Sequence, residues 1–464
     1  MKLTLIGHES WSIQAGGTHA LVDPILGPSF GSDPQRQFTI FPAREVLLER
    51  LPAVDGIVLT SEHLQHFHPA SLRYLKNSLG RRLLQPTVLV PELFPGAAEE
   101  IVRRCGLDVR RVDSQAEFHI GELTCRFYMP HTGVLYWDNR VASLHVEHRG
   151  GEALFIQSDT RIADSYYSDV NEGRVAEPQV MVVTNNFQAS SSEETIGLDN
   201  LLPVADARYS RISGLRLLEE IIHQPVRRLQ RVPALILAGN GYRDPLGNMR
   251  QPWSNEELAD ISSELSLLRA VHCLKPGQCF DVECASLGKP VDWVTLRSQG
   301  EQRLRPERCE HAEGPRTSVA RIKRHLDEMA KTWLIGRYGQ VLMAQSEYLG
   351  QSVGPCRLVL QLLRGDASLQ LVLDITRVEF VEAPYEGLAV IKRYPYGIRV
   401  DYDDFLSLLA GDLQIWEVMN LSASQWYVCD RYDSPLAFWL EYYNEQVDAR
   451  RALRSYEQSL AQSL

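Results

Sequence analysis

The sequence predicts an α/β protein in two domains, and three observations support this. The 464 residues exceed the usual size of a single hydrophobic core. The composition is 44% hydrophobic and 23% charged, which excludes a disordered or fibrous chain. Short apolar runs alternate with segments of helical periodicity, as they do in α/β domains.

The first half of the chain carries the alternating pattern. Short β-like segments at its start predict a meander of hairpins, and the apolar strand Gly56–Thr60 leads to a helix that begins at Pro69. A polar stretch over residues 298–317 interrupts the pattern, so we place the first domain at 1–297 and call 298–317 a linker. Further strands are predicted at 87–90, 124–128, 142–147, 153–156 and 180–183, with helices near 97–105 and 215–229.

The second domain, 318–464, is predicted to be an α+β accessory domain. A helix from Ser318 to Leu334 precedes a strand-like pair, Cys356–Leu363 and Ser368–Ile375. Helical segments follow around 403–409 and 437–456. These helices would cover a cleft or form the contact of a homodimer, and periodicity does not choose between the two.

Charge and hydropathy limit the partners. The chain has 48 basic and 59 acidic residues, a net charge of −11, and no stripe of Lys and Arg that would follow a phosphate backbone. We therefore expect no nucleic acid partner. Apolar runs are shorter than the roughly 20 residues of a membrane span, and the first ten residues do not form a secretory signal. We expect no membrane contact and a cytoplasmic location.

The eight cysteines are scattered and contain no Cys-x-x-Cys pair. This pattern favours free thiols and excludes a four-cysteine zinc ribbon. It also excludes a Rieske centre, whose irons need paired cysteine and histidine ligands. Any redox chemistry would therefore need an external electron donor.

Three histidines, His63, His66 and His68, lie within six positions directly after the strand that ends at Thr60. Neutral imidazole is the commonest metal ligand in proteins, and loops at strand ends present functional groups. A solvated, histidine-rich loop is the alternative. The metal interpretation gains support because His131 and Asp159 also follow apolar strands.

The order of these segments resembles the metallo-β-lactamase fold, and most closely its branch of CMP-N-acetylneuraminate hydroxylase-like proteins. The resemblance includes Gly7-His8-Glu9-Ser10, Leu21-Val22-Asp23-Pro24, the loop Ser61–His66, His131 and Ser158-Asp159-Thr160. It continues through Leu237–Tyr242 and Leu274–Gly277 and recurs weakly near 401–417. The resemblance implies an αββα sandwich with a metal at the histidine-rich loop.

Two departures from the family pattern affect the metal site. The family loop reads His-x-His-x-Asp-His, whereas this chain has Ser61 and Gln65 in place of the first histidine and the aspartate. In this comparison Asp159 remains the one anionic ligand, so the charge count favours one divalent ion over two. The resemblance then implies an ion held by His63, His131 and Asp159, with His66 as a fourth ligand or a replacement.

Other residues have supporting roles in this prediction. His66 and His68 are candidates for proton transfer. Four further residues are expected to orient the metal ligands through hydrogen bonds: His8, Asp23, Ser61 and Gln65. Stabilisation of a turn accounts equally well for His8 and Asp23. The turn after strand 234–237 would present Asn240, Tyr242 and Arg243 to a substrate, or would only connect two elements.

The leading hypothesis is a single-metal enzyme that acts on a small polar metabolite. Two histidines and one carboxylate with open positions are typical of non-haem Fe(II) oxygenases, so a hydroxylase that takes electrons from an external donor is favoured. A zinc- or manganese-dependent hydrolase can be built from the same atoms. A third hypothesis is a non-catalytic binding protein, because Ser61 and Gln65 also fit a decayed site.

Overall fold

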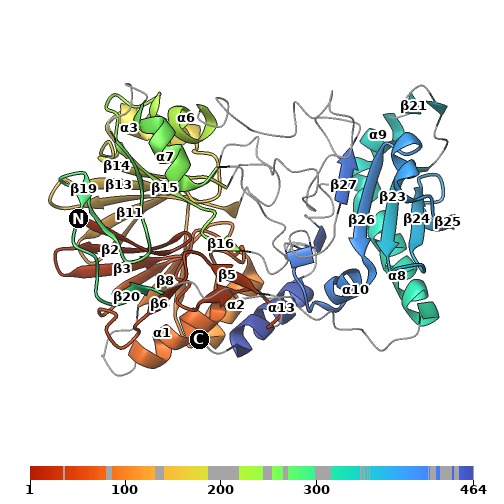
Figure 1. Cartoon of the computed structure of the whole chain (residues 1–464), viewed down its shortest axis with the longest axis horizontal. Coiled ribbons are helices and arrows are strands. Elements are labelled where there is room, and N and C mark those ends of the chain that lie inside the picture. The colour runs from red at the N-terminus through yellow and green to blue at the C-terminus, as the bar shows by residue number, and fades with distance from the viewer. Residues whose placement is uncertain are drawn as a thin grey trace.

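The computed structural model confirms the predicted αββα sandwich within residues 1–297, and a third sheet lies beside it (Figure 1). Two β-sheets stack face to face, with helices on the outer face of each. The structure describes residues 1–34, 37–79, 86–130, 140–186, 219–243, 253–264, 270–297, 315–344, 347–348, 351–352, 354, 356–415, 417–418, 425–428, 442–443 and 449–462.

The first sheet has the order β19-β18-β1-β2-β3-β7-β8-β9. Strands β1 to β3 form the predicted antiparallel meander, and β3, β7, β8 and β9 run parallel. Two helices, α1 (Pro69–Leu79) and α2 (Gly96–Arg104), cover its outer face. The strands are β1 (Lys2–Gly7), β2 (Ser10–Ala15), β3 (Thr18–Val22), β7 (Gly56–Val58), β8 (Thr87–Pro91), β9 (Val109–Val112), β18 (Cys279–Asp281) and β19 (Ser286–Leu287).

The second sheet has the order β10-β11-β12-β13-β14-β15-β17, and its last four strands are parallel. Its outer face is covered by α3 (Asp164–Asn171), a π-helical turn over Glu219–His223 that leads into α6 (Gln224–Val226), and α7 (Asn255–Ser263). The strands are β10 (Glu117–Ile120), β11 (Leu123–Tyr128), β12 (Ser143–His148), β13 (Ala153–Ile156), β14 (Val180–Thr184), β15 (Ala234–Ala238) and β17 (Val271–Cys273).

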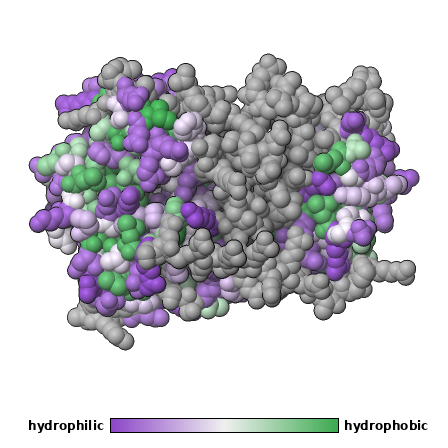
Figure 2. Space-filling model, in the orientation of Figure 1, coloured by the Kyte–Doolittle hydropathy of each residue, from purple (hydrophilic) through white to green (hydrophobic). Residues whose placement is uncertain are grey.

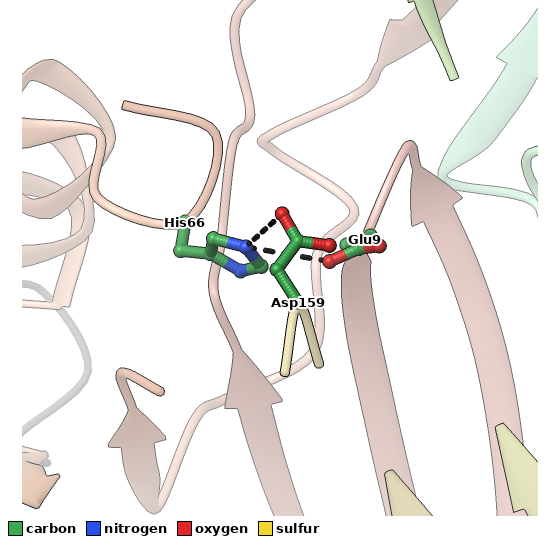
Figure 3. A group of neighbouring side chains, drawn as sticks. All are labelled: Glu9, His66 and Asp159. Carbon is green, nitrogen blue, oxygen red and sulfur yellow. Dashed lines mark hydrogen bonds and ion pairs between the residues drawn. The ribbon is translucent and has the colours of Figure 1, made fainter. Parts of the chain in front are cut away.

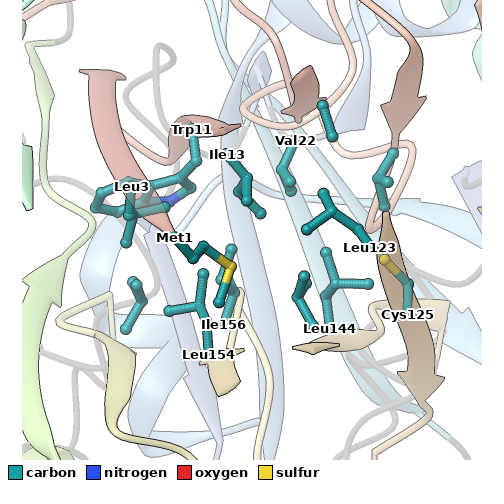
Figure 4. Packing of buried hydrophobic residues seen from close by; sticks show 14 of the residues in the cluster. Met1, Leu3, Trp11, Ile13, Val22, Leu123, Cys125, Leu144, Leu154 and Ile156 are labelled. Carbon is teal, nitrogen blue, oxygen red and sulfur yellow. The ribbon is translucent and has the colours of Figure 1, made fainter. Parts of the chain in front are cut away.

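The main core fills the space between the two sheets (Figure 4). Leu3, Trp11 and Ile13 from the first sheet face Leu144 and Leu154 from the second, and all are buried. Strands β13, β14 and β15 are buried on both faces, between this core and the outer helices. That double burial explains why they read as continuous apolar runs instead of an alternating pattern.

Three small pairings complete the sandwich and close its edge. Strand β16 (Tyr242–Arg243) pairs with β5 (Phe38–Ile40), which also pairs with β4 (Ser29–Phe30). Strand β20 (Val294–Leu296) pairs with β6 (Arg44–Val46). The first group holds the turn before β16 against the turn between β1 and β2.

The predicted helix at 215–229 differs from the structure. Residues 215–218 lie outside the described chain, and residues 219–226 form the π-helical turn and the short α6. Pro225 lies within α6 and has no backbone N–H to donate, which limits regular helix at this point.

The C-terminal part contains a five-stranded sheet with the order β25-β24-β23-β26-β27. The predicted strand pair is confirmed as β23 (Cys356–Leu363) and β24 (Leu369–Asp374). The predicted helix at 318–334 is longer, because α8 (Pro315–Met329) continues through a π-helical turn (Ala330–Leu334) into α9 (Ile335–Ala344). The remaining elements are β21 (Glu347–Tyr348), β22 (Gln351–Ser352), β25 (Glu379–Ala383), a 3-10 helix (Gly387–Lys392), β26 (Tyr396–Asp401), α10 (Tyr402–Ala410) and β27 (Gln425–Val428).

The last helix, α13 (Ala449–Ala461), packs on α1 and α2 of the sandwich, as Figure 1 shows. Its Tyr456 ring lies edge-on to Phe67, with the ring centroids 5.2 Å apart. A second link joins buried Glu417 to the sandwich, because its carboxylate accepts a hydrogen bond from the backbone N–H of Ser32. Of the helix expected at 437–456, residues 442–443 and 449–456 are helical in the described chain, and α13 extends to 461.

Two surface observations bear on partners. In the described part of the chain, no helix is long and apolar enough to cross a membrane. Hydrophobic and hydrophilic side chains are intermixed over the coloured parts of the face in Figure 2. Large hydrophobic side chains that are exposed, such as Leu93 and Met343, come from separate elements.

Candidate metal centre

Several strands end at one edge of the sandwich, and their polar termini meet there. Strands β3 and β7 run parallel in the first sheet, so Asp23 and the loop 59–68 leave from the same edge. Strands β13, β14 and β15 run parallel in the second sheet, so Asp159, Asn186 and Asn240 follow neighbouring strand ends. The carboxyl ends of strands are the usual ligand-binding edge of such sheets.

The loop 59–68 holds His66 at this edge. The backbone N–H groups of His66 and Phe67 both donate to the carbonyl of His63, at 2.8 Å each, so the loop turns back on itself. Phe67 is buried between Phe94 and Tyr456, with ring centroids 5.9 and 5.2 Å away. This apolar anchor fixes the loop and leaves the neighbouring imidazole of His66 in the polar interior.

Three potential metal-ligand atoms converge here, one each from Glu9, His66 and Asp159 (Figure 3). Its Nε2 lies 3.1 Å from Oδ2 of Asp159 and 3.4 Å from Oε2 of Glu9. Within the described residues, these three side chains form a group whose ligand atoms all lie within 4.8 Å of one another. His66 is fully buried, and Glu9 is 3% exposed.

Asp23 fixes the orientation of the His66 ring. Its Oδ2 lies 2.9 Å from Nδ1 of His66 and accepts a hydrogen bond from the hydroxyl of Thr60 at 2.5 Å. Its Oδ1 accepts the backbone N–H of Thr60 at 2.7 Å. A carboxylate behind an imidazole places the proton on Nδ1 and points the Nε2 lone pair at a metal position, as in many metalloproteins.

Two side chains from the end of β14 hold the carboxylates of Glu9 and Asp159 together. The hydroxyl of Thr184 lies 3.0 Å from Oε1 of Glu9 and 3.1 Å from Oδ1 of Asp159. The amide Nδ2 of Asn186 also donates to both, at 2.8 Å for Glu9. These contacts involve Oε1 of Glu9 and Oδ1 of Asp159, so Oε2 of Glu9 and Oδ2 of Asp159 remain facing His66.

The pKa values of these three side chains reflect how closely their ionisable groups lie. Burial alone would lower the pKa of His66, but the charges and hydrogen bonds of Asp23 and Asp159 hold it well above its usual value. Burial and the charge of Asp159 raise the pKa of Glu9 well above its usual value. Burial opposes ionisation of Asp159, yet the neighbouring His66 holds the pKa of Asp159 well below its usual range.

Backbone strain is concentrated around the same group. Seven residues other than glycine have a positive φ in the described chain, and four lie in the turns at this edge. These four are His8 at 51°, Asp23 at 46°, Ser158 at 58° and Asn240 at 54°. Such conformations cost of order 1–3 kcal/mol each and cluster at functional sites.

His63 lies outside this group, contrary to the predicted ligand set. Its buried Nε2 is 3.9 Å from Oε1 of Glu62, whose carboxylate forms a buried ion pair with Arg140. Burial lowers the pKa of His63 to about 4. Glu62 and His63 line a small pocket whose other walls come from the C-terminal part, including Ile415 and Ala452.

The remaining loop residues take structural positions. The ring of His68 is buried and lies 2.6 Å from the hydroxyl of Ser71 through Nδ1, away from the Glu9, His66 and Asp159 group. Burial lowers the pKa of His68 to about 3. Ser61 is buried and accepts the backbone N–H of His63, whereas Gln65 is partly exposed.

The three residues predicted to contact a substrate, Asn240, Tyr242 and Arg243, have different surroundings. Asn240 is bonded through its backbone N–H to Asn186, so it lies one residue removed from the carboxylates. Tyr242 packs edge-on against His8, with centroids 4.8 Å apart. The guanidinium of Arg243 lies over the ring of Phe41. His8 adjoins the group in the chain because it directly precedes Glu9, and burial lowers the pKa of His8 to about 3.

Two differences from the predicted ligand set remain. His131 lies outside the described residues. Glu9 was not predicted as a ligand, yet two carboxylates, those of Glu9 and Asp159, face His66 in the described residues, where the sequence suggested one anionic ligand. The sequence did contain a signal for Glu9, because Glu9 follows His8 in the opening motif. A carboxyl group in a turn between antiparallel strands does not indicate which distant residue it contacts.

One comparison with known proteins bears directly on the fold. Residues 2–163 match the family model described as the beta-lactamase superfamily domain, and the sandwich is the metallo-β-lactamase fold. No curated protein matches the chain.

Solved structures similar to this chain include hydrolases and a hydroxylase. The isothiocyanate hydrolase from Delia radicum gut bacteria is 18% identical, with a TM-score of 0.40 over 61% of this chain and 99% of that one. A possible metal-dependent hydrolase from Veillonella parvula is 15% identical, with a TM-score of 0.42 over 60% and 98%. CmlA, a diiron beta-hydroxylase from Streptomyces venezuelae, is 18% identical, with a TM-score of 0.35 over 57% and 49%.

Proposed function

We propose that this protein is a metal-dependent enzyme in which Glu9, His66 and Asp159 hold one divalent cation. The observation that carries the proposal is the convergence of Oε2, Nε2 and Oδ2 of these residues at the strand-end edge. The beta-lactamase superfamily match over residues 2–163, which includes all three residues, also supports it.

The residues present fit a cation on two further grounds. Oε2 of Glu9 is buried and has no hydrogen-bond partner among the described residues, although buried polar atoms are usually satisfied. Three carboxylates, from Asp23, Glu9 and Asp159, surround the single imidazole of His66. A divalent cation would neutralise charge that one imidazolium cannot balance.

The donor set favours a hard cation over zinc. Zinc sites are built mainly from cysteine and histidine, whereas carboxylate oxygens suit harder cations. One imidazole and two carboxylates lack the second histidine of the two-histidine, one-carboxylate iron site and form an oxygen-rich set that suits manganese. Iron stays our preferred metal because of the resemblance to the hydroxylase branch, with manganese as the nearest competitor.

We further propose that the reaction is the oxidation of a small polar metabolite, following the resemblance to the hydroxylase branch. When bound, the cation would supply Lewis acidity and vacant positions for dioxygen or water. Asp23 would keep the His66 ring in one tautomer, and Asn186 and Thr184 would keep the carboxylates in place. Electrons would come from a separate donor protein.

The substrate is proposed to extend toward the pocket beside His63. That pocket borders the loop that carries His66, and its other walls come from α10, residues 413–415, Tyr443 and α13. The C-terminal part would then contribute to substrate selection.

Anaerobic metal binding followed by a reaction with nitric oxide tests the proposal. Metal-free protein should bind one Fe(II) per chain, and nitric oxide should give the paramagnetic signal of iron with a vacant position. Asp159→Asn should abolish the signal, while Asp169→Asn, at a buried aspartate bonded to Tyr128, should keep it. Absence of metal binding contradicts the enzyme. Turnover of nitrophenyl esters or phosphodiesters without dioxygen would favour a hydrolase instead.

A further inference from the structure

The ring of His8 is held rigidly beside the candidate metal centre. It lies in the turn between β1 and β2, is 3% exposed and has a φ of 51°. Phe30 stacks on it at 6.1 Å, and Tyr242 meets it edge-on at 4.8 Å. The next residue in the chain is Glu9, and the charges of Asp159 and His66 act on the ring.

A backbone hydrogen bond fixes the tautomer of this ring. The N–H of Gly241 points at Nδ1 of His8 from 3.2 Å, and a backbone amide can only donate. Nδ1 must therefore accept and cannot carry a proton. A neutral imidazole then carries its proton on Nε2, which makes Nε2 a donor.

The approach of the two turns makes this arrangement hard to change. A Cβ on residue 241 would lie 2.4 Å from Cα of His8, so glycine is required for the close contact. Turning the ring over would put a carbon against the Gly241 N–H and leave this part-buried amide without its acceptor.

The Nε2–H group has no acceptor within the described chain, and it is buried. An unsatisfied buried donor next to a cluster of ligand groups is a feature that a bound molecule would relieve. Metal coordination would not relieve it, because coordination needs a lone pair on Nε2, which here carries the proton. The missing partner is therefore an acceptor.

We propose that His8 donates a hydrogen bond through Nε2–H to an oxygen of the substrate bound at the Glu9, His66 and Asp159 centre, and is not a metal ligand. This inference rests on the proposed function. The substrate class is a small molecule with a carboxylate, phosphoryl or carbonyl oxygen near the reacting position. A donor at this point offsets the repulsion between such an oxygen and the two carboxylates of the site.

Azide binding to the Co(II)-loaded protein tests this role without turnover. We expect His8→Phe, which keeps an aromatic ring but removes the donor, to weaken azide binding by about tenfold to a hundredfold. The Co(II) affinity should stay within about threefold of wild type, because a ligand is not lost. His68→Phe, at another buried neutral histidine, is the matched control and should leave azide affinity unchanged.

Two outcomes would overturn the inference. A large loss of Co(II) affinity in His8→Phe would make His8 a ligand, and unchanged azide affinity would remove its role as a donor. His8→Asn covers a failure of the phenylalanine variant to fold, because asparagine tolerates a positive φ, and it should retain Co(II) affinity.

A measurement on metal-free protein separates this inference from the proposed function. Nitrogen resonances of ¹⁵N-histidine-labelled protein distinguish protonated from unprotonated ring nitrogens, and His8→Asn identifies the signals of His8. Protonated Nε2 with unprotonated Nδ1 is expected, and the reverse overturns the inference alone. Failure of wild-type protein to bind Co(II) would instead contradict the proposed metal centre.

Discussion

His63 and His66 stand three residues apart in one loop, yet the fold gives them opposite environments. Both rings are buried. His66 faces Asp23, Glu9 and Asp159, and its pKa is held well above the usual value by the charges of Asp23 and Asp159 that outweigh burial. His63 faces the Glu62 and Arg140 ion pair, and burial lowers its pKa to about 4.

The difference shows that histidine spacing alone does not define a metal site. The tight turn from His63 to Phe67 sends the two rings to different sides of the loop. What distinguishes His66 is the carboxylate behind its Nδ1 and the two carboxylates in front of its Nε2. The two rings also differ in what they adjoin. His63 lines the pocket formed with the C-terminal part, whereas His66 faces the carboxylates.

The largest expected effect is on metal affinity when a carboxylate on the His66 side is neutralised. Glu9→Gln or Asp159→Asn should weaken Mn(II) binding by more than about a hundredfold, beyond the loss typical of an outer partner. His63→Ala should change it by less than about threefold. Isothermal titration of metal-free protein measures both. A comparable loss in His63→Ala would break the contrast between the two rings.

The next largest effect is expected on the free energy of unfolding, when the ion pair beside His63 is broken. Glu62→Gln leaves the buried guanidinium of Arg140 without its carboxylate partner, so the free energy of unfolding should fall by about 3–5 kcal/mol. Urea denaturation followed by circular dichroism would show the change. Metal affinity of the folded variant should persist, which separates the two sides of the loop.

A double variant controls for the cause of that loss. Glu62→Gln combined with Arg140→Met removes both charges and should recover much of the stability, because the burial penalty of the unpaired cation disappears. If the double variant were as unstable as the sum of the single variants, the ion pair would not be the reason for the loss.

A smaller effect is expected for the group that orients His66. Asp23→Asn should reduce Mn(II) affinity by about tenfold to a hundredfold, because the amide cannot hold the Nδ1 proton as a carboxylate does. Asp55→Asn is the matched control, since Asp55 also accepts a backbone N–H at β3, from His19, but touches no ligand group. Equal losses in both would mean that the effect is on folding.

The sequence predicts some features of this site because they depend on local order. The alternation of apolar strands with helices predicts an α/β domain, and the family resemblance implies the sandwich. The positions of His66, Asp159 and Asp23 just after strands predict their meeting at one edge. These predictions need the strand directions but not the side-chain packing.

Other features depend on contacts between distant segments, and the sequence pattern is silent on them. Glu9 joins the group because the turn between β1 and β2 approaches the ends of β13 and β14. The packing of α13 on α1 and α2 brings Tyr456 behind Phe67, almost 400 residues earlier in the chain. An amphipathic helix shows that one face is buried but not which surface covers it.

The most direct test of the metal centre is a crystal structure of the protein grown with Mn(II), using anomalous scattering to locate the ion. We predict one anomalous peak bonded to Glu9, His66 and Asp159, with Asp23 behind His66 and with His63 uncoordinated. A peak coordinated by His63 but not by Glu9, or crystals with no ion at this edge in saturating Mn(II), would contradict the account.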